Sequence, residues 1–287
     1  MAGLSGAEID DLGVRVEELP GGALGWRSRV RYAVDAGGRA GLLAHRSHEV
    51  VPIDRCRIAH PSIQALPVTG TQWPLDDHVS VIASTGGDVT VRGSATGLVS
   101  GPATVRERAV GRDWELPAED FWQVHPSAPD TLGTAVLDLL QVKAGERGWD
   151  LYGGAGLFSA VLAQAVGASG AVTLVESDRS GVEAARRNLA DLPHVTVVRS
   201  SVERFRWRDG PDVVVLDPPR AGAGATVVRT IIGSGARAVA YVACDPAAFA
   251  RDVATFRSAG WRLARLRAFD AFPMTHHIEC VGLLLPT

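Results

Sequence analysis

Two side chains near the C-terminus have the types and the surroundings that covalent catalysis needs. Cys244 ends an apolar run and stands just before Pro246, a residue suited to the first turn of a helix. The dipole at a helix N-terminus favours the thiolate, which is the nucleophilic form of cysteine. Glu279 lies in the last strand-like segment and can act as a base. A lone cysteine is more often structural, but the helix-opening proline favours chemistry here.

A glycine-rich turn upstream is typical of a site for a nucleotide-like cofactor. Residues 150–156 end a strand and open a helix. Glycine allows positive φ and close approach of the backbone to a ligand, so Gly154 and Gly156 are candidate cofactor-binding residues. A lone Gly-x-Gly is weak evidence. The dinucleotide-binding pattern is incomplete, because Ser159 stands where its third glycine would be.

Acidic residues end two further strand-like segments of the same region. Glu176 is placed to accept hydrogen bonds from both ribose hydroxyls, a feature of NAD enzymes and of S-adenosylmethionine enzymes alike. Asp217 is followed by two prolines and Arg220. The prolines stop strand pairing and fix a rigid turn, which aims Asp217 at the ligand-binding edge of a parallel sheet.

The elements that must position these residues alternate between strand and helix. This alternation predicts an α/β fold with a doubly wound, mostly parallel sheet. The last two strands have no helix between them, so we expect an antiparallel C-terminal hairpin. Expected strands are 148–152, 171–176, 195–199, 212–217, 238–243, 261–268 and 277–285, and expected helices are 157–166, 179–191, 224–234 and 247–258.

The N-terminal part has a different pattern. Short runs of alternating apolar and polar residues, separated by glycine pairs, predict a smaller β-rich domain. We expect a loosely ordered leader over residues 1–25, the β-rich domain over 26–118 and the catalytic domain over 119–287.

Composition places the chain among ordinary globular proteins. It has 287 residues, 46% of them apolar, and a net charge of −3. No run is long enough to cross a membrane, no secretory signal is visible, and three scattered cysteines do not form a disulfide framework. We therefore expect a cytoplasmic protein with no membrane partner.

The basic residues are unevenly distributed. Residues 26–60 hold seven arginines against three acids, a net charge of +4. Arginine matches phosphate geometry, so Arg29, Arg31 and Arg46 are candidate contacts to nucleic acid. A solvated surface explains the same pattern about as well.

Five segments together resemble the family of RNA uracil-5-methyltransferases, which make 5-methyluridine in tRNA and rRNA. They are residues 121–125, 150–156, 217–220, 241–246 and 272–279. The resemblance implies a Rossmann-like class I methyltransferase fold, S-adenosylmethionine as cofactor and RNA as partner. It also implies that Cys244 is the nucleophile and Glu279 the base. By the same resemblance the cofactor contacts are Gln123, Tyr152, Glu176 and Asp217.

The implied chemistry explains these residue types. Uracil carbon 5 is a poor nucleophile until a thiolate adds to carbon 6. After methyl transfer, a base must remove the proton from carbon 5 so that the cysteine can leave. The target nucleotide must be flipped out of its stack. Phe272 is a candidate for stacking on it, with Phe121, Trp122 and Phe269 as further aromatics, at least two of which we expect in the core.

The chain also departs from the family pattern. Family members often carry an N-terminal β-barrel RNA-binding module and four iron–sulfur cysteines, whereas here only Cys56 resembles one of the four. We therefore expect no cluster. Gly153, Leu157 and His125 replace residues that are common in the family.

Other functions stay open at this stage. One is methylation of a different substrate by the same fold, and another is an inactive RNA-binding remnant. A dehydrogenase is a more distant alternative. The Cys244/Glu279 pair favours uracil chemistry, because a directly nucleophilic substrate needs no thiol. We expect a monomer, and the sequence does not specify which RNA or which uridine is modified.

Overall fold

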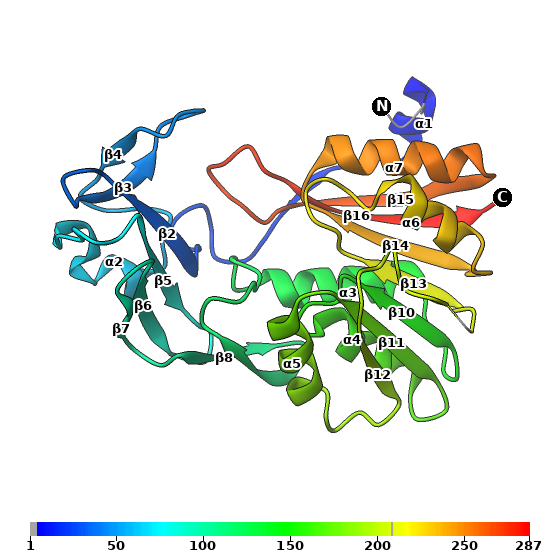
Figure 1. Ribbon diagram of the computed structural model, residues 1–287. Helices are drawn as coiled ribbons and strands as arrows, with labels where there is room; N and C mark the ends of the chain where they lie inside the picture. Colours follow the sequence, from blue (N-terminus) through cyan, green and yellow to red (C-terminus); the bar gives the residue numbers. More distant parts are fainter. Residues whose placement is uncertain (1–4, 208) are drawn as a thin grey trace. The chain divides into compact units, whose positions relative to one another are not determined.

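A computed structural model of the chain describes residues 5–207 and 209–287. The chain forms two compact units (Figure 1). One comprises residues 20–128, and the other comprises residues 1–19 together with 129–287. The sequence predicts a domain boundary after residue 118. In the structure, residues 119–128 belong to the N-terminal unit instead. No helix of the described part is long and apolar enough to cross a membrane.

The larger unit contains an eight-stranded sheet in the order β1-β15-β16-β14-β13-β10-β11-β12. Strands β10 to β14 are mutually parallel, and β16 runs antiparallel to both β14 and β15. The predicted doubly wound sheet with a C-terminal hairpin is confirmed. The strands are β1 (Val16–Glu18), β10 (Arg147–Leu151), β11 (Ala171–Glu176), β12 (Val195–Arg199), β13 (Val213–Leu216), β14 (Ala238–Ala243), β15 (Trp261–Asp270) and β16 (Glu279–Pro286).

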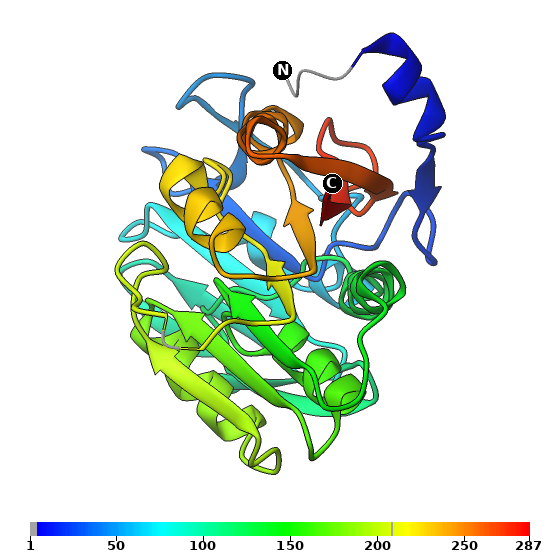
Figure 2. The same ribbon diagram turned by 90° about the vertical axis from the view of Figure 1, so that its right-hand side faces the viewer.

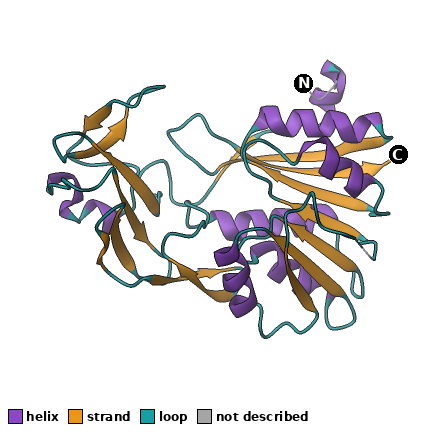
Figure 3. Cartoon of the chain, in the orientation of Figure 1, coloured by secondary structure: helices purple, strands orange, loops and turns teal. Residues whose placement is uncertain are grey.

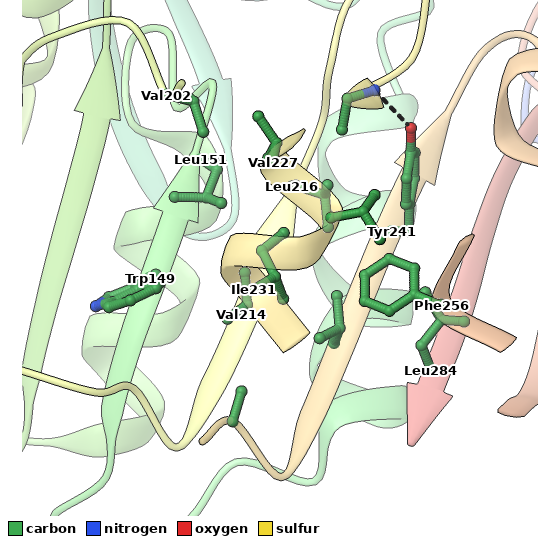
Figure 4. Packing of buried hydrophobic residues seen from close by; sticks show 14 of the residues in the cluster. Trp149, Leu151, Val202, Val214, Leu216, Val227, Ile231, Tyr241, Phe256 and Leu284 are labelled. Carbon is green, nitrogen blue, oxygen red and sulfur yellow. Dashed lines mark hydrogen bonds between the residues drawn. The ribbon is translucent and has the colours of Figure 1, made fainter. Parts of the chain in front are cut away.

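Helices cover both faces of this sheet (Figure 2). A buried apolar cluster, which includes Trp149, Leu216 and Phe256, packs α6 and α7 on one face (Figure 4). On the other face, Leu162 of α4 fills the space beside Gly148, where a Cβ would come within 3.1 Å. The helices are α1 (Gly6–Asp11), α3 (Ala128–Leu140), α4 (Leu157–Val166), α5 (Arg179–Asn188), α6 (Gly224–Ile232) and α7 (Pro246–Ser258).

The N-terminal segment differs from the loose leader that we expected. Residues 5–19 contain α1 and β1, and β1 extends the large sheet by pairing in parallel with β15. A capping box at Ser5 begins the helix. Arg267 donates to both carboxylate oxygens of Glu17, at 2.8 and 2.6 Å, and Arg257 pairs with Glu8. Contacts with residues far along the chain order this segment, and no local sequence pattern predicts them.

The smaller unit is mostly β-structure, as expected (Figure 3). Its six-stranded antiparallel sheet has the order β4-β3-β2-β5-β6-β7, and β8 and β9 form a separate hairpin. One face of the sheet carries the core, which includes Tyr32, Val79 and Val91. The elements are β2 (Arg29–Val34), β3 (Ala40–Leu43), β4 (Val50–Pro52), α2 (Pro61–Gln64), η1 (Pro67–Gly70), β5 (His78–Ala83), β6 (Val89–Gly93), β7 (Gly97–Ser100), β8 (Thr104–Ala109) and β9 (Arg112–Pro117).

Candidate active site

The register of β14 and β16 brings Cys244 and Glu279 together. Ala243 pairs with Cys280 at the end of this antiparallel ladder, so Cys244, the residue after β14, and Glu279, the first residue of β16, lie at the same end of the two strands. The negative charge of Glu279 acts on the thiol of Cys244 at this short range. Cys244 is half-buried, whereas Glu279 is only 3% exposed. The predicted nucleophile and base are therefore neighbours, although a helix and a whole strand separate them along the chain.

The electrostatics of Cys244 differ from the expectation. Burial raises the pKa of its thiol above the ordinary 9.0, and the negative charges of Glu279 and Asp217 raise it further, while Arg220 lowers it. The N-cap residue Asp245 of the following helix accepts the hydrogen bond from Ala248 N at 2.7 Å. Because the pKa of the thiol is raised and not lowered, the favoured thiolate that we expected is not found, and the thiol is the favoured form at neutral pH.

The carboxyls around this thiol also have raised pKa values. Burial raises the pKa of Glu279 well above its ordinary value, and the negative charge of Asp217 adds to the effect, which Arg220 opposes. Burial and Asp150 raise the pKa of Asp217 to about 7. A carboxylate kept from water is a stronger base than a solvated one. The site therefore combines a thiol with two carboxyls whose basicity burial increases.

The glycine-rich turn adopts the left-handed backbone that the sequence suggested. φ is +63° at Tyr152, +52° at Gly154 and +100° at Gly156. Tyr152 is held there without the freedom of glycine, which is a strained arrangement common at functional sites. At Gly156 a Cβ would lie 2.6 Å from the Leu189 side chain, so only glycine fits. At Gly154 a Cβ would meet nothing within 4 Å, so there is open space beside this part of the turn.

Two acids flank this turn and fit a bound nucleoside with a charged amino acid tail. Glu176 accepts from Gly154 N at 2.9 Å and from Asp178 N at 2.7 Å, which fixes its carboxylate beside the turn. Asp150 is fully buried, and its Oδ2 accepts from Ser159 at 2.7 Å. Its Oδ1 has no hydrogen-bond partner among the described residues. An orphaned carboxylate oxygen suits a positively charged donor, and the residues present therefore fit S-adenosylmethionine.

A buried clamp that sequence reasoning missed ties the turn after Asp217 to α7. Oδ2 of Asp252 accepts from Ala223 N at 2.7 Å, Gly224 N at 3.2 Å and Tyr241 Oη at 2.7 Å. Tyr241 in turn accepts from Ala223 N (Figure 4). The clamp joins the turn that carries Arg220 to the helix that follows Cys244. An acid on the apolar face of α7, next to Val253, is the one signal in the sequence that could have identified it.

The remaining candidates are scattered over the two units. Gln123 is buried in the N-terminal unit, and Phe272 lies in the loop between β15 and β16, its ring 6.0 Å from that of His277. Arg31 and Arg46 are exposed. No group of three or more histidine, cysteine, aspartate or glutamate side chains in residues 5–207 and 209–287 is arranged to hold a metal ion.

Arg29 is not free to contact RNA as the sequence suggested. Its Nη1 donates to the carbonyl oxygens of Ala118 and Asp120, each at 3.0 Å, and its Nη2 pairs with Glu107 at 3.1 Å. The side chain is 11% exposed. We therefore assign Arg29 a structural role within the N-terminal unit.

Comparison with known protein families identifies two matching models. Residues 210–287 match the tRNA (uracil-5-)-methyltransferase family, and residues 128–240 match the methyltransferase small domain. The first match includes Cys244, Glu279 and Asp217.

Relatives match almost the whole chain. An uncharacterized RNA methyltransferase of Streptomyces avermitilis is 44% identical, over 94% of this chain and 70% of the relative. The 23S rRNA (uracil(1939)-C(5))-methyltransferase of Pseudomonas aeruginosa is 31% identical, over 94% of this chain and 71% of the relative. Against a further relative, from Streptomyces coelicolor, the chain spans 66% of the relative's length.

A solved structure has the same fold over both units. It is the Pyrococcus abyssi tRNA (uracil-54, C5)-methyltransferase in complex with S-adenosyl-L-homocysteine, with a TM-score of 0.75 and 22% identity. The match covers 96% of this chain and 80% of that one. At this identity the likeness concerns the fold alone.

Proposed function

The chain belongs to the family of RNA uracil-5-methyltransferases, and we propose that it methylates carbon 5 of a uridine in rRNA or tRNA through a covalent cysteine–uracil adduct. The observation that carries this proposal is the register of β14 and β16, which brings a thiol and a buried carboxyl to the same end of two neighbouring strands. An enzyme whose substrate is already nucleophilic has no need of that pair. The orphaned oxygen of Asp150 and the open space at Gly154 support S-adenosylmethionine as the cofactor.

The proposed mechanism begins with loss of the thiol proton. Because the pKa of Cys244 is raised, attack requires an acceptor, and Asp217, whose pKa is about 7, is suited to that role. The sulfur then bonds to carbon 6 of the flipped uracil, and the electron pair of the carbon 5–carbon 6 double bond moves toward the carbonyl oxygen at carbon 4. Carbon 5 is now nucleophilic.

When bound, S-adenosylmethionine would supply the electrophilic methyl group for this carbon and would leave as S-adenosylhomocysteine, and the turn at Gly154 with Glu176 and Asp150 would hold it. Carbon 5 then carries both a proton and the new methyl, and Glu279 takes the proton. The electron pair left behind re-forms the ring double bond and expels the sulfur of Cys244.

The test follows the proton that must leave carbon 5. RNA transcripts carrying tritium at carbon 5 of uridine should release tritium to water only when both protein and S-adenosylmethionine are present. Chromatography of digested RNA should show 5-methyluridine in equal amount. Methyl transfer without tritium release would indicate a different target atom. If the protein binds S-adenosylmethionine but gives neither tritium release nor 5-methyluridine with total rRNA and tRNA as substrates, the inactive RNA-binding remnant is favoured.

Cofactor binding gives a second prediction. Replacing Glu176 with alanine should weaken S-adenosylmethionine binding by on the order of tenfold or more, because hydrogen bonds to a charged group contribute about 1.5–3 kcal/mol each. Isothermal titration measures the dissociation constant. Glu183→Ala is the matched control, since Glu183 is an exposed acid on α5 that pairs with Arg179. Binding of NADH in place of S-adenosylmethionine would refute the cofactor assignment.

A further inference from the structure

The N-terminal unit contains a groove on the polar face of its six-stranded sheet. The groove has a volume of about 330 Å³, which is at the small end for ligand sites. Its charged lining is predominantly basic. Four arginines line it, Arg27, Arg29, Arg31 and Arg92, against the two acids Glu119 and Asp120.

The sheet register places two of these arginines in one row with a hydroxyl. Arg31 of β2 pairs with Ser80 of β5, and Ser80 pairs with Arg92 of β6. Neighbouring strands lie about 4.8 Å apart, so the two arginine positions are roughly 10 Å apart, with the serine between them. Their sequence neighbours, such as Val30 and Val81, face the core, so the whole row shares the open face.

Both guanidinium groups in this row are available to an anion. Arg31 is exposed and forms no hydrogen bond or ion pair with any residue of the described chain. Arg92 pairs with Glu119 at 3.2 Å, but the Glu119 side chain is 65% exposed. An ion pair of that kind contributes little stability and exchanges readily for a better ligand.

The groove is walled and preformed. Residues 118–124 border it, and Arg29 holds that segment through its bonds to the carbonyl oxygens of Ala118 and Asp120. Nε of Arg29 is buried without a hydrogen-bond partner among the described residues. Phe121, on the same wall, is 75% exposed. An aromatic face therefore stands beside a row of cations.

We propose that this groove binds a single-stranded segment of the substrate RNA, with Arg31 and Arg92 on neighbouring phosphates and a base stacked on Phe121. The proposal rests on the proposed function, which makes RNA the substrate. Arginine matches phosphate oxygens bidentately, and aromatic faces stack on bases regardless of sequence. A single strand can bend its backbone into a walled groove, whereas an A-form duplex presents its phosphates on a rigid surface.

The test compares two double variants with equal charge change. The row variant, Arg31→Gln/Arg92→Gln, removes both arginines of the row. The control variant, Arg39→Gln/Arg108→Gln, removes two exposed arginines of the same unit that lie outside the groove. In the wild type these two arginines pair with Asp35 and Asp113. Fluorescence anisotropy with a labelled single-stranded oligoribonucleotide measures affinity across a range of salt. The row variant should bind about tenfold more weakly, and its log–log salt dependence should be shallower by about 1.4, or about 0.7 per phosphate. The control should match the wild type.

Three results would overturn the proposal. One is equal weakening in both variants, which would mean a general charge effect. Another is an unchanged salt slope in the row variant. The third is a duplex of the same sequence that binds as tightly as the single strand and loses as much affinity in the row variant. Tritium release by the wild type on the same preparation separates the two proposals. If the wild type releases no tritium but the row variant binds RNA selectively more weakly, only the proposed methylation is refuted. If the wild type releases tritium but the row variant binds RNA as the wild type does, only the proposed groove is refuted.

Discussion

Replacing Cys244 with alanine is expected to abolish methyl transfer to RNA and to leave cofactor affinity unchanged. The proposed reaction depends on a covalent bond from this sulfur to carbon 6, so no partial route remains. Removal of the nucleophile from a covalent enzyme lowers kcat by on the order of 10⁶-fold. Tritium release measures the loss, and isothermal titration with S-adenosylmethionine measures the affinity. Full turnover by the variant would mean that carbon 5 is activated in some other way.

RNA containing 5-fluorouridine allows the covalent bond between Cys244 and the uracil to be detected directly. Methyl transfer leaves fluorine where a proton should depart, so the adduct persists as an enzyme–RNA band on a denaturing gel. Cys244→Ala should give no band. Cys280→Ala is the matched control, because Cys280 is the buried thiol beside Glu279 and should leave the band intact.

The pH dependence of band formation follows from the raised pKa of the thiol. Because that pKa lies above 9.0, the thiolate fraction increases as pH rises from neutral, and the rate of adduct formation should rise with it. Arg220→Gln should move the whole profile to higher pH, since Arg220 is the cation that lowers the pKa. Arg262→Gln, which removes an exposed arginine on β15, should leave it in place. A rate independent of pH would contradict a protonated resting thiol.

The sequence was sufficient for the alternation of elements and for the identity of Cys244 and Glu279 as candidates. The alternation rests on local signals, namely periodicity, prolines and glycines, whereas the roles of the two residues follow from the resemblance of five segments to the family. The proximity of the two residues has no such local signal in the sequence. It depends on the register of β14 against β16, and a shift of one residue would send Glu279 to the opposite face.

The features that sequence reasoning missed are all consequences of tertiary packing. The helix N-terminus next to Cys244 suggested a favoured thiolate, but burial and the negative charges of two carboxyls raise the pKa of the thiol instead. Arg29 belongs to an arginine-rich segment, yet its partners are carbonyl oxygens and an acid far along the chain. The clamp made by Asp252 joins two segments whose proximity exists only in the folded sheet. Of these contacts only the clamp has a local signal, the acidic Asp252 on the apolar face of α7, and that signal does not identify its partners.

Replacing Glu279 with glutamine is expected to separate methyl transfer from release of the product. Glutamine keeps the shape of the side chain but cannot take the proton from carbon 5. With ordinary uridine the variant should therefore add and methylate once, and then stall as a methylated adduct. Loss of a general base lowers turnover by about 10²–10⁴-fold. Denaturing gels with radiolabelled methyl groups should show the stalled band, and mass spectrometry should show the added methyl.

Stability measurements distinguish this result from misfolding. Burial raises the pKa of Glu279 above its ordinary 4.5, so the folded state binds more protons than the unfolded state as pH rises above that value. The wild type therefore loses stability as pH increases through that range, and glutamine removes the penalty. Glu279→Gln should be at least as stable as the wild type at neutral pH, with a flatter dependence on pH, whereas Glu183→Gln should match the wild type in both stability and turnover. Fast turnover by Glu279→Gln, or a loss of stability that accounts for its inactivity, would remove Glu279 from the proposed role of base.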